Sequence, residues 1–139
     1  MKNFLFIFLL ILPLYSFPQV YKLKVFRTKL AFFDGEDWKT KGVNETSFLA
    51  VINLDKDKIQ TYGKKFGDYD IIKIKKSEVD EDGGVFAVFD GIDENGENCA
   101  ITLSIFSEKI KIQSEDGAIA SLGIRYGDRL LVFYMKKDD

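Results

Sequence analysis

The chain has 139 residues, a formal net charge of −2 at pH 7 and an isoelectric point near 5.3. This mildly acidic balance gives no general attraction for nucleic-acid phosphates, so we expect no nucleic-acid binding. Histidine is absent and Cys99 is the only cysteine, which excludes a disulfide within the chain, a zinc site of cysteine and histidine, and a histidine-dependent catalytic triad.

The first eighteen residues have the order of a secretory signal. A single basic residue, Lys2, precedes an unbroken apolar run, Phe4–Leu12, and a helix-ending segment with two prolines closes at Pro18. The run is shorter than the roughly 20 residues that a membrane-spanning helix needs. We therefore predict that residues 1–18 are removed. Residues 19–139 then form one all-β domain, secreted or periplasmic, without stable membrane insertion.

Downstream of the signal, apolar residues recur at period two between turns rich in Gly, Asp and Asn, which is typical of an all-β protein. Strands are predicted near Val20–Phe33, Ser47–Leu54, Lys58–Tyr62, Tyr69–Lys75, Val85–Asp90, Cys99–Phe106, Lys109–Gln113, Ala118–Ile124 and Arg129–Lys136. In the clearest of them, Cys99 and the residues that alternate with it share one apolar face, so Cys99 is interpreted as a buried structural residue.

The turns between these strands are short, and short turns join neighbouring antiparallel strands. The predicted topology is an up-and-down meander of about eight or nine strands that closes into a small barrel, with a β-sandwich as the alternative. Such a barrel resembles those of lipocalins and other calycins at the level of fold. Glu36 and Asp37 precede Trp38 where lipocalins have Gly-x-Trp, so the resemblance implies no functional residue.

One longer polar connection, Asp34–Thr46, interrupts the regular spacing and contains Trp38. We expect this segment to be a long crossing connection, a lid or a short helix. Trp38 is a candidate contact anchor for a protein or a sugar. Its alternative role is to plug the end of the barrel.

The residues from Ser77 to Glu108 include nine acids and no lysine or arginine. A meander could place some of these acids at one end, where the oxygens of Asp80, Asp82, Asp93 and Asn95 would form a weak calcium site. The competing interpretation is a set of solvated hairpin turns.

Lysines alternate with apolar residues on two of the predicted strands, at Lys22 and Lys24 and again at Lys73 and Lys75. This spacing puts them on the solvent face. There they protect strand edges against pairing or form a docking surface for an acidic partner.

No catalytic constellation stands out, and no cofactor is expected. Large side chains on the predicted inward faces, at Phe48, Phe86 and Phe133, favour a packed barrel interior. The sequence therefore predicts an exported, non-enzymatic module that binds a protein in the bacterial envelope or exterior. The alternatives are a carrier of a small apolar, lipid-like ligand and a weak calcium- or glycan-binding module.

Overall fold

The computed structural model describes residues 20–63, 67–81, 83–107 and 117–137. The predicted signal, the predicted strand Lys109–Gln113 and Asp82 lie outside these ranges.

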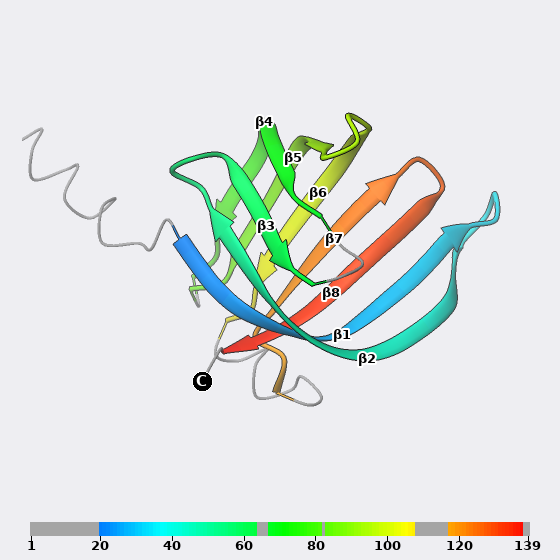
Figure 1. Cartoon of the computed structure of the whole chain (residues 1–139), viewed down its shortest axis with the longest axis horizontal. Coiled ribbons are helices and arrows are strands. Elements are labelled where there is room, and N and C mark those ends of the chain that lie inside the picture. Colours follow the sequence, from blue (N-terminus) through cyan, green and yellow to red (C-terminus); the bar gives the residue numbers. More distant parts are fainter. Residues whose placement is uncertain (1–19, 64–66, 82, 108–116, 138–139) are drawn as a thin grey trace, which may run out of the picture.

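Eight antiparallel strands follow one another in chain order, and hydrogen bonds between the first and the last close them into a ring (Figure 1). The strands are β1 (Val20–Phe33), β2 (Trp38–Asn53), β3 (Lys58–Tyr62), β4 (Tyr69–Val79), β5 (Val85–Asp93), β6 (Asn98–Ile105), β7 (Ala120–Tyr126) and β8 (Arg129–Lys137). This confirms the predicted all-β meander and its closure.

The ring is uneven because β3 is much shorter than its neighbours. β3 meets β4 through two register pairs only, Lys58 with Asp70 and Ile59 with Tyr69. On its other side β3 reaches β2 no further than Leu49. The first part of β2 is therefore hydrogen-bonded to β1 alone, while β1 pairs on its other side with β8 as far as Phe32. We call this end of the β1–β2 hairpin, residues 28–44, the arm (Figure 1).

The arm corrects the prediction of a lid, helix or crossing connection at Asp34–Thr46. β2 already begins at Trp38, and the connection from β1 is a short turn. The Asp34 carboxylate stabilises this turn by accepting hydrogen bonds from the backbone N–H groups of Glu36 and Asp37, at 2.9 and 3.0 Å. The start of this strand could not be recognised from the sequence, because the polar residues after Trp38 lack the apolar alternation of a strand with one buried face.

The core fills the interior of the ring. Residues that alternate along each strand are almost fully buried, among them Val25, Ile52, Phe89, Ile101, Leu122 and Phe133. The rings of Phe48 and Phe133 meet edge to face, with their centroids 5.5 Å apart. Large side chains thus pack against one another across the interior.

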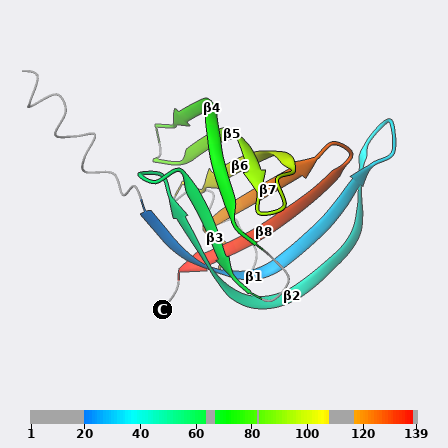
Figure 2. The ribbon, with the colours of Figure 1, turned by 45° about the horizontal axis from the view of Figure 1, so that its top comes forward.

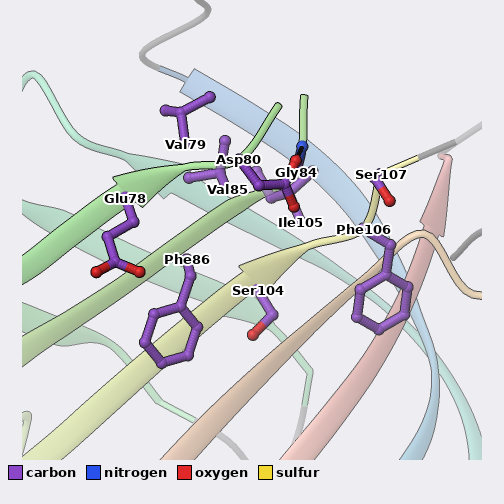
Figure 3. Close-up of a pocket in the computed structure, with 10 residues that line it drawn as sticks. All are labelled: Glu78, Val79, Asp80, Gly84, Val85, Phe86, Ser104, Ile105, Phe106 and Ser107. Atoms are coloured by element: carbon purple, nitrogen blue, oxygen red, sulfur yellow. Dashed lines mark hydrogen bonds between the residues drawn. The ribbon is translucent and has the colours of Figure 1, made fainter. Parts of the chain in front are cut away.

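Phe86 does not belong to this core, contrary to the sequence prediction. It alternates with buried Ala87 and lies opposite Ser104 of β6, so it is on the outer face with 37% of its surface exposed. Figure 3 shows its ring on the same side of the sheet as Ser104. The period-two rule places Ala87 and Phe89 inward and leaves Phe86 outside.

The core assignment predicts different costs for two phenylalanine truncations. Phe133→Ala removes a fully buried ring and should lower the free energy of unfolding by about 3 to 5 kcal/mol. Phe32→Ala, on the exposed arm, serves as the matched control and should cost less than about 1 kcal/mol. Urea unfolding of the domain measures both, and equal losses would contradict the assignment.

Candidate functional site

The inner face of the ring continues from the core onto the arm. On the arm, the residues of this face are no longer covered by strands from the other side of the ring. Along β1, Thr28, Leu30 and Phe32 lie opposite Phe133, Leu131 and Arg129 of β8. Directly opposite residues share one face of a sheet. The face therefore passes from the buried core at Phe133, through half-buried Leu131, to the exposed arm. We call this open end of the ring the mouth.

Two hollows of opposite chemical character lie at the mouth. One, of about 310 Å³, is lined by Leu30, Ala31, Phe32, Lys41 and Arg129. The other, of about 240 Å³, is lined by Gly67, Asp68, Tyr69, Asp93, Glu94, Asn95, Tyr126 and Leu131. They are neighbours, because Leu131 lies opposite Leu30 and Arg129 lies opposite Tyr126. The mouth thus has an apolar and basic side next to an acidic side.

A hydrogen-bond network organises the acidic side. The Tyr126 hydroxyl donates to Asp93 Oδ2 at 2.9 Å. The other carboxylate oxygen accepts from the backbone N–H groups of Asn95 and Glu97, each at 2.9 Å. The hydrogen bond from the backbone N–H of Glu97 is the main reason that the pKa of Asp93 is lowered. The carboxylate is therefore ionised at neutral pH and ties the β5–β6 turn to β7.

The two phenols at the mouth stay neutral at ordinary pH. Burial raises the pKa of Tyr69 to about 12. The pKa of Tyr126 is raised further, first by burial and then by its hydrogen bond to Asp93. A phenol that keeps its proton donates hydrogen bonds but does not act as a base or a nucleophile near pH 7.

The predicted acidic residues that the structure describes, Asp80, Asp93 and Asn95, do not meet at one site. Asp80 precedes β5 and Asp93 ends it, so their turns lie at opposite ends of that strand. Asp80 accepts a 2.7 Å hydrogen bond from the backbone N–H of Gly84 and lines a separate hollow of about 490 Å³ between β4, β5 and β6 (Figure 3). Asp93 and Asn95 share the mouth. Across the described ranges, no three acidic or cysteine side chains are grouped to hold a metal ion.

Trp38 does not plug the ring. It is 37% exposed at the tip of the arm, where its ring centroid lies 5.5 Å from that of Phe33. The guanidinium of Arg125 lies over the same indole, 5.1 Å from its centroid. Arg125 points away from the core because it alternates with buried Ile124. We call Phe33, Trp38 and Arg125 the aromatic–arginine patch.

A backbone hydrogen bond holds this patch in place. The N–H of Phe33 donates to the carbonyl of Asp128 at 2.7 Å, which joins the arm to the β7–β8 turn. Sequence reasoning missed Phe33 and Arg125 as partners of Trp38. Arg125 lies next to the arm only because the ring closes through β1 and β8. The residues around Arg125 in the sequence do not indicate this contact.

Two other candidate residues, Cys99 and Lys75, make contacts within the fold that favour a structural role. Cys99 is buried, and burial raises the pKa of its thiol to about 11, so the thiol is neutral and poorly nucleophilic. Lys75 has an acidic partner within the chain, since its ammonium lies 3.2 Å from Asp90. This contact competes with docking of an acidic partner at that lysine.

No protein-family model, curated protein or solved structure matches this chain. Within the described ranges, no helix has the length and apolar character needed to cross a membrane.

The raised phenol pKa values predict a late tyrosine titration and a loss of stability in alkali. Because the folded-state pKa of Tyr69 and Tyr126 exceeds the usual value of about 10, their contribution is fully present below pH 10 and disappears as the pH rises towards 12 and above. Phenolate absorbance of the folded domain should show this delayed step, and Tyr126→Phe should remove part of it. Titration of every phenol near pH 10, with the circular dichroism still native, would contradict the prediction.

Proposed function

We propose that this protein is an exported, non-enzymatic module that binds another protein through the aromatic–arginine patch. The observation that supports the proposal is the exposed cluster at the tip of the arm, where Phe33 lies beside Trp38 and the Arg125 guanidinium lies over the indole. Tryptophan and arginine are enriched among the few residues that carry most of the energy of protein–protein contacts.

The surroundings of the patch favour such a contact. Large exposed hydrophobic residues lie on both faces of the arm: Phe33, Trp38 and Val43 on the outer face with the patch, and Leu30 and Phe32 on the inner face at the mouth. Grouped exposed apolar side chains are typical of an interaction surface. Stacking also restricts the Trp38 and Arg125 side chains before a partner arrives, which reduces the entropy lost on binding.

The interior supports a surface function over carriage of a lipid-like ligand inside the ring. Fully buried side chains from seven of the eight strands fill it, including Phe89, Ile101 and Phe133. The non-enzymatic part of the proposal has its own support. The chain lacks histidine, and the buried thiol and the two phenols at the mouth hold their protons at neutral pH.

Capture with patch variants tests the proposed contact. The domain of residues 19–139 is immobilised and exposed to envelope extract and culture medium of its own host, and bound proteins are quantified by mass spectrometry. Trp38→Ala and Arg125→Ala should each reduce recovery of a reproducible partner by about tenfold or more, as truncation of a contact anchor does.

Ile74→Ala is the control, because Ile74 is a large exposed apolar residue that lies on β4, outside the patch. The Ile74→Ala domain should capture as much of the partner protein as the unchanged domain does. Equal recovery with Trp38→Ala would exclude the patch as the contact, and the absence of any reproducible partner would count against the function itself.

Export is tested with a charge in the apolar run of the signal. Leu9→Arg interrupts Phe4–Leu12 and should leave the precursor unprocessed in the cytoplasm, since targeting depends on an uninterrupted apolar segment. The unchanged protein should leave the cytoplasm with a mature N-terminus at or near Gln19. Intact masses of cell fractions distinguish the two, and an uncut, cytoplasmic wild-type chain would refute the proposed export.

A further inference from the structure

An irregularity in the register of the arm directs a lysine into the mouth. Leu30 of β1 lies opposite Gly42 of β2. The next residue of β1, Ala31, lies opposite Thr40, so Lys41 has no partner in the register. Such a β-bulge redirects a side chain, and the side chain of Lys41 lines the apolar and basic side of the mouth. The bulge therefore places an ammonium group beside the apolar residues of the arm.

A second cation, the Arg129 guanidinium, lies between the two sides of the mouth. Arg129 is opposite Phe32 on β1 and opposite Tyr126 on β7. Its contact with Glu97, at 3.6 Å, joins two exposed side chains and leaves guanidinium N–H groups for a ligand. Lys41 forms no ion pair with a described residue. Both cations are thus available to an anionic group.

The opposite charge lies on the acidic side, at the same end of the ring. Figure 2 shows the tip of the arm, the β5–β6 turn and the β7–β8 turn at this end. Asp93 is held ionised by its hydrogen bonds, and the exposed residues Asp68 and Glu94 line the same hollow. Leu131 also lines this hollow and lies opposite Leu30 of the basic side. An apolar strip therefore connects a positive side to a negative side.

From this arrangement, we propose that the mouth binds a short apolar peptide with free termini. Its carboxylate would lie between Lys41 and Arg129, its ammonium would lie beside Asp93, and its side chains would cover the apolar strip. The carboxylate is then above β1 and the ammonium above β7, with β8 between them. Two strand spacings amount to about 10 Å, and an extended chain spans about 3.3 Å per residue. A peptide of about three residues therefore fits the distance between the two charges.

Ligands with only one of these charges suit the mouth less well. A long-chain carboxylate would satisfy Lys41 and Arg129, but its apolar tail would cover the carboxylates of the acidic side without pairing them, which is unfavourable. A free amino acid has both charges, but they are too close together to reach both sides. The inference does not rest on the proposed function, because the mouth is on the inner face of the arm and the aromatic–arginine patch is on its outer face.

Calorimetric titration of the domain of residues 19–139 with the tripeptide leucyl-alanyl-leucine tests the inference. Low ionic strength is used, because salt screens exposed charges. We expect saturable binding with a Kd below about 1 mM. Acetylation of the peptide amine and amidation of its carboxylate each remove one charge, and each should weaken binding about tenfold. Free leucine should also bind about tenfold more weakly or less, because it does not span the two sides.

Variants of the domain assign each terminus of the peptide to its side of the mouth. Lys41→Gln should weaken binding of the free tripeptide about fivefold and leave binding of its C-terminal amide unchanged. Glu94→Gln should likewise weaken the free tripeptide and leave the N-acetylated form unchanged. Lys73→Gln is the matched control, because it removes an exposed lysine of β4 that does not line the mouth. It should leave the affinity for the free tripeptide unchanged.

Circular dichroism checks that each variant folds. The absence of saturable binding at millimolar tripeptide would overturn the inference, and so would equal binding by the tripeptide blocked at both ends or by free leucine. An equal loss of affinity for the amide and the free tripeptide in Lys41→Gln would also overturn it. The same holds if Lys73→Gln weakens binding as much as Lys41→Gln does.

Discussion

Backbone N–H and C=O groups in a sheet need a partner strand, and β3 supplies one over only five residues, Lys58–Tyr62. On the other side of the molecule, β1 pairs with β8 from Leu23 to Phe32. The ring therefore closes firmly through β1 and β8 and thinly through β3 and β4. The open edge of β2, the arm and the mouth all follow from this difference.

The mouth keeps its shape through polar contacts because apolar packing ends there. Below it, Phe48 and Phe133 fill the ring, while at its rim the Asp93 carboxylate joins the β5–β6 turn to Tyr126 of β7. On the basic side, the Arg129 guanidinium lies over the Tyr126 ring at 5.5 Å and 3.6 Å from Glu97. The same turn and the same phenol thus connect the acidic side of the mouth to the basic side.

Much of the fold could be predicted from periodicity. The strand from Asn98 to Ile105 has Cys99, Ile101 and Leu103 buried, as the alternation indicates, because one face meets the core and the other meets solvent. The start of β2 could not be predicted in this way. Both faces of β2 are largely exposed near Trp38, so neither face needs apolar residues. The sequence therefore has no alternation of apolar and polar residues there.

The candidate site was harder to predict than the fold, since its contacts cross the ring. Asp93 and Asn95 were recognised as turn residues, which they are, but Tyr126 is 33 residues from Asp93 and reaches it only through the order of the strands. Trp38 stood out by its type, whereas its partner Arg125 had no distinguishing neighbours in the sequence. A pattern shows which residues share a face, and the register of distant strands decides which of them touch.

The arm leaves large apolar side chains exposed, as β4 does at Ile72, Ile74 and Val79. With no disulfide available, the domain depends on buried apolar surface, and burying a leucine or phenylalanine side chain contributes about 1.5 to 3 kcal/mol. Leu30, Phe32, Phe33, Trp38 and Val43 leave much of that contribution unused in the single chain. A covering protein would recover it. Phe33, Trp38 and Arg125 add the residue types that carry most of the energy of protein contacts, which is why we expect the partner to bind at the arm.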